Sequence, residues 1–226
     1  RRRIRLQISP SGQFGYHAAA SHQIVEIDSC LIADERLNDV METLRRWLRH
    51  VRTSFRELEI ISGDEPNQIV VVAYAVDRFL PSDEADCTGL VDENRAPHGL
   101  ILIGDNGRKV WGQPAISVRL NDDLSLTVDA DVFTQVNPEG NRVILDELLR
   151  LGDFQARDRV LELYCGSGNF TLPIARRCRE IVAVEGDRSS IANGKLNAQK
   201  NGLENIHWIC SPVPTAVAQL HKRKDK

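Results

Sequence analysis

The sequence predicts an α/β protein in two parts, an α+β central domain over residues 1–125 and a Rossmann-like region over residues 126–226. In the first part, strand-like segments with alternating apolar residues flank one amphipathic helix. In the second part, continuous apolar strands alternate with helices, which is typical of right-handed βαβ units and a parallel sheet. The pattern changes near Pro138, a residue type favoured at the first position of a helix.

Apolar spacing and turn residues define the elements expected in the first part. Residues 3–9 and 14–27 alternate like strands around a Ser-Pro-Ser-Gly turn and predict a hairpin, whose second strand contains a possible break at three consecutive alanines. Residues 32–55 predict one amphipathic helix, and residues 55–62 and 68–76 predict a second hairpin. The helix would bury Leu37, Val40, Met41, Leu44, Leu48 and Val51. Further expectations are a helix or loop over 80–98 and strands over 99–105, 115–122 and 124–137.

The second part is expected to alternate strictly between helix and strand. Asn201 and Gly202 form an Asn-Gly pair of the kind that ends helices. The expected helices cover residues 137–154, 168–178, 188–203 and 215–222, and the expected strands cover 158–166, 180–187 and 205–211.

Composition excludes several classes of protein. The formal net charge of −3 excludes a global basic field, so any nucleic-acid contact must come from local patches. The sequence contains no run of 18 apolar residues, so no transmembrane helix is expected, and the N-terminus lacks the apolar core of a signal peptide. The five cysteines are scattered and form no Cys-x-x-Cys pair, which favours a cytoplasmic protein without a disulfide framework or a self-contained metal site. They are Cys30, Cys87, Cys165, Cys178 and Cys210.

A glycine turn after the first strand of the second part predicts a ligand site. Gly166 and Gly168 follow an apolar strand and precede a helix expected to start near Asn169, so a ligand can approach the backbone there. Glu185 ends the next strand, where a carboxylate can accept hydrogen bonds from both hydroxyls of a ribose. A Gly-x-Gly pair alone is a weak signal, because glycines also end strands for steric reasons.

The spacing after the turn bears on which ligand binds. NAD remains possible, but Phe170 and Thr171 stand where a dinucleotide site needs its third glycine. The turn therefore leaves less room for a pyrophosphate and favours S-adenosylmethionine, which carries no phosphate.

Several segments together carry a resemblance to a known family. "DVFTQVNPEGN", "LELYCGSGNFTLPIA", "VAVEGD" and "NAQKNGLENI" are similar to motifs of the bacterial RNA uracil-5 methyltransferases, and "FGYHAAASHQIVEIDSC" looks like that family's central domain. These enzymes make 5-methyluridine in ribosomal or transfer RNA. The resemblance implies an α+β central domain followed by the first half of a Rossmann-like class I S-adenosylmethionine-dependent methyltransferase fold.

The resemblance also assigns cofactor contacts to individual residues. Gln135, Tyr164, Asn169 and Glu185 occupy positions that contact S-adenosylmethionine in the family. The alternative interpretations are a helix cap for Gln135 or Asn169, a core position for Tyr164 and a solvated loop acid for Glu185. After the third strand the family often has a polar residue near the adenine, and in "CSPVP" Ser211 could take this role whereas Pro212 cannot donate a hydrogen bond.

The family's catalytic residues have no counterpart in this sequence. Its members use a cysteine that adds to carbon 6 of uracil and a base that removes the proton from carbon 5. Both lie in motifs downstream of the cofactor motifs, and these motifs do not occur here. Cys165 belongs to the cofactor motif and is expected to be a small buried residue. The expectation is a fragment that lacks the N-terminal and C-terminal parts, with a degraded homologue as the alternative.

Metal, RNA and self-association predictions complete the interpretation. The resemblance allows Cys30 to be one ligand of an iron–sulfur cluster in the intact protein, which it cannot hold alone, and the alternative is a plain buried cysteine. Residues 1–5, 45–56 and 221–226 are basic and could contact RNA, or could be solvated surface. The strand over 206–210 would form an exposed edge, where pairing with another chain is possible. A non-catalytic module that binds S-adenosylmethionine or RNA remains the rival to an enzyme, and a methyltransferase with a small-molecule or protein substrate is a further alternative.

Overall fold

The computed structural model describes residues 1–91, 97–121 and 123–224, so part of the helix or loop expected over 80–98 lies outside the described residues. The contacts divide the chain into two compact units. Unit 1 comprises Arg1–Ile116 and Asp129–Asp131, and unit 2 comprises Ser117–Val128 and Val132–Lys226. The division at 125/126 drawn from the sequence falls inside a strand, Ser125–Asp129.

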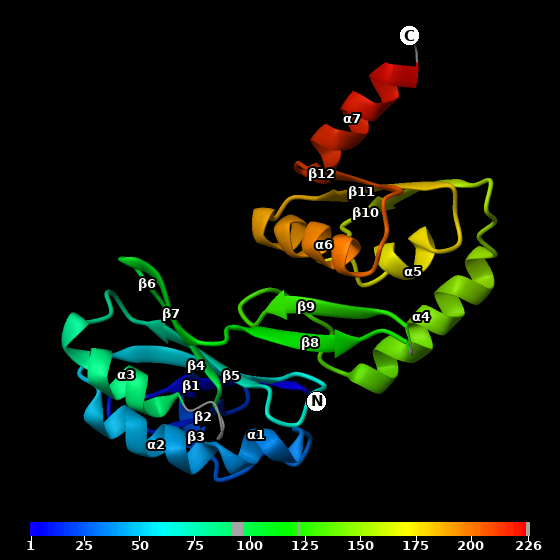
Figure 1. The fold of residues 1–226 in the computed structure, drawn as a ribbon. Coiled ribbons are helices and arrows are strands. Elements are labelled where there is room, and N and C mark those ends of the chain that lie inside the picture. The colour runs from blue at the N-terminus through cyan, green and yellow to red at the C-terminus, as the bar shows by residue number, and fades with distance from the viewer. Residues whose placement is uncertain (92–96, 122, 225–226) are drawn as a thin grey trace. The chain divides into compact units, whose positions relative to one another are not determined.

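Unit 1 is a seven-stranded sheet with helices packed on one face (Figure 1). The strand order is β3-β2-β1-β4-β5-β6-β7, and all neighbours are antiparallel except β5 and β6. The strands are β1 (Arg3–Ile8), β2 (Phe14–His17), β3 (Ile24–Glu26), β4 (Phe55–Ser62), β5 (Ile69–Ala75), β6 (Gly99–Gly104) and β7 (Gly107–Gly112). The helices are α1 (Glu35–Asp39), α2 (Met41–His50) and α3 (Glu84–Leu90), with a 3-10 turn η1 (Pro81–Asp83) before α3.

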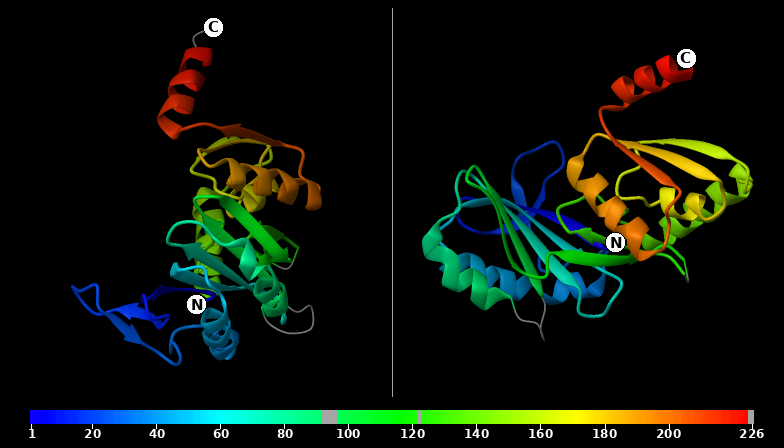
Figure 2. Two further views of the ribbon diagram at one scale, coloured as in Figure 1. Left: turned by 90° about the vertical axis from the view of Figure 1, so that its left-hand side faces the viewer. Right: turned by 45° about the horizontal axis from the view of Figure 1, so that its top comes forward.

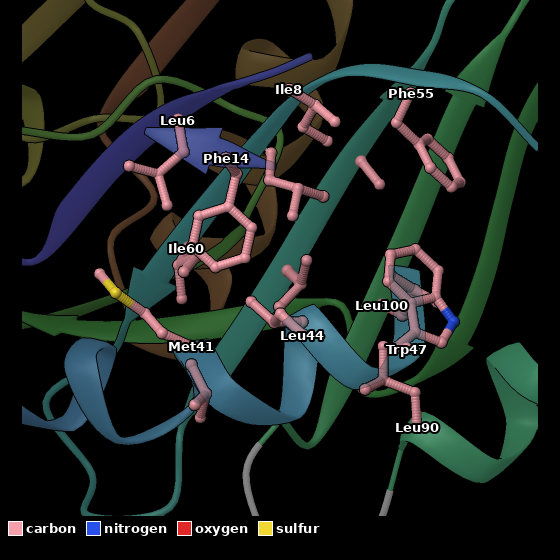
Figure 3. Packing of buried hydrophobic residues seen from close by; sticks show 14 of the residues in the cluster. Leu6, Ile8, Phe14, Met41, Leu44, Trp47, Phe55, Ile60, Leu90 and Leu100 are labelled. Carbon is pink, nitrogen blue, oxygen red and sulfur yellow. The ribbon is translucent and has the colours of Figure 1, made fainter. Parts of the chain in front are cut away.

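The core of unit 1 lies between this sheet and its helices (Figure 3). Leu6, Phe14, Leu44 and Leu58 are fully buried within it, because the inward positions of β1, β2 and β4 face the apolar side of α2. Trp47 packs against Phe55 with ring centroids 5.2 Å apart. These contacts hold the end of α2 against the start of β4.

Unit 1 differs from the sequence expectations in three details and confirms one. The single helix expected over 32–55 is interrupted at Val40, which ends α1 and precedes α2. Leu48 and Val51 are only half-buried, whereas Trp47, which the spacing argument omitted, is buried. The second strand of the first hairpin divides into β2 and β3 around the alanines, which confirms the break. β7 was not expected as a strand of its own.

Unit 2 contains most of a hairpin, whose outer residues belong to unit 1, and the beginning of a parallel sheet. The hairpin consists of β8 (Ala115–Arg119) and β9 (Ser125–Asp129), and α4 (Pro138–Gly152) follows it. The parallel sheet has the order β10-β11-β12, formed by Arg159–Leu163, Glu180–Glu185 and Ile206–Cys210. Its remaining helices are α5 (Thr171–Ala175), α6 (Arg188–Lys200) and α7 (Val213–Lys224).

The two faces of the parallel sheet carry different helices (Figure 2). Ala183 packs with Ile191 of α6, whereas Val184 packs with Val213 and Ala216 of α7. Successive residues of β11 thus point to opposite faces, as in any strand. This arrangement leaves the carboxyl ends of β10 and β11 side by side, where the glycine turn and Glu185 lie. Among the described residues, no helix is long and apolar enough to cross a membrane.

Candidate functional site

The glycine turn bends sharply through three residues with positive φ. Tyr164 has φ 63°, Gly166 φ 55° and Gly168 φ 99°. Main-chain hydrogen bonds fix the bend, from Cys165 N–H to the Val184 carbonyl (3.1 Å) and from Gly168 N–H to the Cys165 carbonyl (3.1 Å). Positive φ is unfavourable for an aromatic residue, and such strain is concentrated at functional sites. Tyr164 is nevertheless held there with 72 % of its surface exposed.

The two glycines of the turn have different surroundings. A Cβ added at Gly166 would meet nothing within 4 Å, so this side of the turn is open to a ligand. A Cβ added at Gly168 would lie 2.3 Å from Cδ1 of Leu172 and 3.3 Å from Trp208. Gly168 is therefore required for internal packing, and only its main chain is left to contact a ligand.

The helix after the turn is shorter and starts later than expected. α5 runs from Thr171 to Ala175, rather than from about Asn169 to Cys178. Its N-cap position is Phe170, without a side-chain cap. A five-residue helix has little dipole to offer a ligand, so the attraction expected from its N-terminus is weak.

Glu185 fastens the turn from the neighbouring strand. Its Oε2 accepts a hydrogen bond from Gly166 N–H (3.1 Å), and its Oε1 accepts from Gly186 N–H (2.7 Å) and Asp187 N–H (2.9 Å). A carboxylate has about four acceptor positions, so one remains for a ligand hydroxyl. Glu185 thus shapes the turn, and its remaining capacity suits one hydroxyl rather than the two of a ribose that the sequence suggested.

Asn169 is held by a residue that the sequence analysis missed. Its amide and that of Asn141 on α4 exchange two hydrogen bonds, each 2.9 Å long. Asn141 is 4 % exposed and sits in the first turn of α4, which Asn137 caps by accepting from Gly140 N–H. The pairing ties α4 to the glycine turn. Asn-x-x-x-Asn spacing at a helix start was the available signal, but it does not reveal the partner.

A small cavity of about 80 Å³ opens beside the turn within unit 2. Four residues expected at the cofactor site line it, namely Gln135, Tyr164, Gly166 and Asn169. Gly168 and Glu185 do not line it. Its other lining residues are Val118, Leu126, Val128, Phe133, Thr134, Cys165, Ser167 and Phe170. The sequence analysis also missed Phe133, which is 72 % exposed like Tyr164.

Comparison with known proteins identifies the family. The family model described as tRNA (Uracil-5-)-methyltransferase matches residues 12–215. The chain belongs to this family. It is 30 % identical over 219 residues to a 23S rRNA (uracil(1939)-C(5))-methyltransferase RlmD of Shewanella woodyi, covering 92 % of this chain and 48 % of the relative. For the protein of that name in Pseudomonas fluorescens, identity is 33 % over 202 residues, covering 87 % of this chain and 44 % of the relative.

The fold comparison agrees with the sequence comparison. A solved tRNA (uracil-54, C5)-methyltransferase of Pyrococcus abyssi, in complex with S-adenosyl-L-homocysteine, matches with a TM-score of 0.68 and 19 % identity. The match covers 94 % of this chain and 55 % of that structure. The resemblance to the RNA uracil-5 methyltransferases and the fold class predicted from sequence are confirmed. The chain spans about half the length of the curated relatives it matches.

Three buried polar atoms lie in the glycine turn of this uracil-5 methyltransferase family member or in the elements that flank it. Oε2 of Glu162, Oγ of Ser167 and Oγ1 of Thr171 have no hydrogen-bond partner among the described residues. Burial raises the pKa of the Glu162 carboxyl to about 7, and a smaller opposing effect comes from the Thr171 hydroxyl, which stays outside hydrogen-bond geometry. The signal in the sequence was an acid in the middle of an apolar strand, and it was missed.

The cysteines of this family member show little nucleophilic character near the turn. Burial raises the pKa of Cys165 to about 12, and the charges of Glu162 and Glu185 add to the effect. Burial also raises the pKa of Cys178. At Cys30, burial raises the thiol pKa, but hydrogen bonds from Tyr16 and from main-chain N–H groups outweigh it and lower the pKa overall. No group of three or more possible metal ligands occurs among the residues that the structure describes.

Proposed function

We propose that this chain is the cofactor-binding portion of an RNA uracil-5 methyltransferase, which transfers a methyl group from S-adenosylmethionine to carbon 5 of a uridine in rRNA or tRNA. The observation that carries the proposal is the open side of the turn at Gly166, fastened by Glu185, in a chain of the tRNA (uracil-5-)-methyltransferase family. The relatives' names, which specify uracil C5 in 23S rRNA or tRNA, support the substrate class.

The residues present fit this cofactor. The remaining acceptor position of Glu185 suits a ribose hydroxyl, and the exposed ring of Tyr164 suits stacking on adenine. Asn169 and Gln135 supply amides at the cavity wall. The unpartnered hydroxyl of Ser167 lies at the cavity wall as well. The cofactor would supply an electrophilic methyl group on a sulfonium.

The cavity is too small to enclose such a ligand by itself. Small-molecule sites commonly have volumes of at least about 300 Å³, against about 80 Å³ here. We infer that the rest of the wall, together with the nucleophilic cysteine and the base, comes from the half of the relatives' length that this chain does not span. The high pKa of Cys165 supports this inference, because a thiol that stays protonated cannot add to carbon 6 of uracil. The chain alone is therefore expected to be inactive.

Other sequence predictions stay predictions. Cys30 lies beside Tyr16, whose hydroxyl donates to Sγ at 3.4 Å, and its role as one iron–sulfur ligand in the intact protein needs partners from elsewhere. Self-association at the β12 edge and a cytoplasmic location are likewise untested, as are the domain division at 125/126 and the individual cofactor contacts, including that of Gly168.

The test uses the complete product of the reading frame that encodes this chain. It is incubated with transcribed 23S rRNA or tRNA and S-adenosylmethionine carrying a deuterated methyl group, and nucleosides from the digested RNA are analysed by mass spectrometry. The proposal expects deuterated 5-methyluridine in one RNA. Cofactor binding without any labelled uridine would favour the non-catalytic module instead.

A further inference from the structure

A second hollow, remote in sequence from the glycine turn, lies entirely within unit 1. It has a volume of about 830 Å³ and is formed by the β1–β2 turn, the C-terminal end of α2 and the start of β4. We call it the arginine groove, because Arg49, Arg52 and Arg56 line it while no Asp or Glu does. In a chain with net charge −3, a groove with three cations and no carboxylate concentrates positive potential locally.

The first two arginines are available to a ligand. Arg49 is 62 % exposed, and its contact with Glu42 is a loose 3.9 Å ion pair between exposed side chains. Such pairs contribute at most about 1 kcal/mol and yield easily to a stronger partner. The Arg52 guanidinium makes no hydrogen bond or ion pair with any residue in the described part of the chain, although its main chain donates to Asp83 at 3.0 Å. The main chain of Arg52 is therefore fixed by a hydrogen bond, whereas its guanidinium group is available to a ligand.

The third arginine is fixed in place. Arg56 donates to the Ala75 carbonyl and lies over the Tyr74 ring, 5.7 Å from its centroid. It contributes charge at the start of β4 from a defined position. Because Arg56 also has a structural role, it is not a suitable site for a test substitution.

The remaining walls suit a polymer with a polar backbone and flat apolar groups. Ser9 and Ser11 bring hydroxyls to the rim, joined by a 2.8 Å hydrogen bond in the tight β1–β2 turn. Val76, which is 51 % exposed, supplies apolar surface, whereas Ile8 and Phe55, both labelled in Figure 3, are core residues that are only 9 % and 5 % exposed. Guanidinium forks match phosphate oxygens, hydroxyls can bind phosphate or ribose, and apolar walls can pack against nucleobases.

We propose that the arginine groove binds the phosphates of a single-stranded segment of the RNA substrate, away from the methyl-transfer site. This inference rests on the proposed function for the identity of the polymer, and on the charge and shape of the groove for the site. It gives the central domain a positioning role in RNA binding, whereas the turn in unit 2 holds the cofactor.

The test compares RNA binding by the 226-residue chain and three variants. The probe is a fluorescein-labelled single-stranded oligoribonucleotide of mixed sequence, and its anisotropy is measured over a range of salt concentrations without cofactor. The variants are Arg49→Gln/Arg52→Gln, the charge-preserving Arg49→Lys/Arg52→Lys, and Arg157→Gln as a control. Arg157 is an exposed arginine of unit 2 that forms no ion pair among the described residues, so it supplies the same chemistry outside the groove.

The expected changes follow from counterion release. Each lost phosphate contact on a single strand reduces the steepness of the plot of log affinity against log salt concentration by about 0.7. The slope of the double Gln variant should therefore be about 1.4 less steep, and its RNA affinity should be roughly 25-fold weaker near 0.1 M salt. The Lys variant should retain the slope, and Arg157→Gln should retain both slope and affinity. Thermal unfolding checks that the variants fold.

Three results would overturn the inference. An unchanged slope in the Gln variant would show that the groove makes no phosphate contact. A lower unfolding temperature with unchanged RNA affinity would mean that Arg49 and Arg52 only complement the C-terminal dipole of α2. Equal competition by polyglutamate of matched charge would reject RNA as the preferred polymer. Titrating each chain with S-adenosylmethionine separates the two proposals, because a Gln variant that keeps the parent chain's cofactor titration but loses RNA affinity has lost the groove contact alone. If the complete product of the reading frame forms no labelled uridine while the groove variants still change the salt dependence, the proposed function fails and the phosphate contact in the groove stands.

Discussion

Replacement of Glu162 by Gln should stabilise unit 2, and the gain should grow with pH. The carboxyl is buried on β10 without a partner for Oε2, and its pKa in the folded chain is about 7 against an ordinary value of 4.5. Between these values the folded state binds more protons at this site than the unfolded state, so stability falls as pH rises. Glutamine has nearly the same shape and no charge, so the variant avoids that loss.

The magnitude follows from the pKa difference. Each unit of difference is worth about 1.4 kcal/mol, so ionised Glu162 costs about 3 kcal/mol once the pH is well above 7. At pH 5 the folded carboxyl is protonated and the unfolded one is partly ionised, so the cost is below about 1 kcal/mol. The difference in unfolding free energy between Glu162→Gln and the parent chain should therefore increase by about 2–3 kcal/mol from pH 5 to pH 8.5.

Urea unfolding followed by fluorine NMR can test this in the labelled chain. With 5-fluorotryptophan incorporated, the Trp208 signal reports on unit 2, whereas Trp47 and Trp111 report on unit 1 and should not respond. Glu180→Gln is the control with the opposite sign, because a hydrogen bond with Arg159 lowers the pKa of that carboxyl. In the parent chain the ionised Glu180 carboxylate stabilises the fold above its ordinary pKa, and this contribution is lost as the pH falls. A Glu162→Gln gain that is constant with pH, or that shrinks as pH rises, would refute the reasoning.

Further substitutions probe how the turn is built. Gly168→Ala should lower the stability of unit 2 by about 1–3 kcal/mol, because the residue has positive φ and the new methyl group would collide with Leu172. Gly166→Ala should cost only about 1 kcal/mol, because that residue also has positive φ but its side of the turn is open. Urea midpoints at the Trp208 signal would check this order, and equal costs would contradict it. Asn141→Ala should cost about 1–3 kcal/mol by leaving the half-buried Asn169 amide unpaired, and a change below about 0.5 kcal/mol in the same assay would show that the pair is not needed.

Local patterns were enough to predict most of unit 2. The three parallel strands, the acid at the end of β11 and the Asn-Gly stop after α6 all follow from periodicity and from residue types with strong backbone preferences. Gly202, for example, has φ 66°, a conformation that glycine adopts without strain. Such features depend on a few neighbouring residues, so they can be recognised before the fold is known.

Features that depend on tertiary packing were not predictable in this way. The sequence analysis gave Gly166 and Gly168 the same role, and only the neighbouring Leu172 and Trp208 distinguish them. The pair of Asn141 and Asn169 joins residues 28 positions apart in the sequence. The interruption at Val40 preserves the apolar spacing on both sides, so periodicity alone did not reveal it.

The arginine groove is another feature that sequence patterns alone did not reveal. The basic stretch over 45–56 is visible in the sequence, but its charges could equally have been dispersed around a solvated helix. The end of α2 at His50 and the turn into β4 bring three of the arginines to one hollow. Backbone geometry, rather than charge content, makes this stretch a candidate for RNA binding.

The most direct test of the central claim is calorimetric titration of this chain with S-adenosylmethionine. The account predicts saturable binding that is lost in Glu185→Ala, which removes the acceptor for Gly166 N–H and for a ribose hydroxyl, and retained in Arg157→Gln. The Trp208 fluorine signal would confirm that unit 2 stays folded in both variants. Absence of saturable binding both by this chain and by the complete product of its reading frame, or binding that Glu185→Ala leaves unchanged, would contradict the claim that the described turn holds the cofactor.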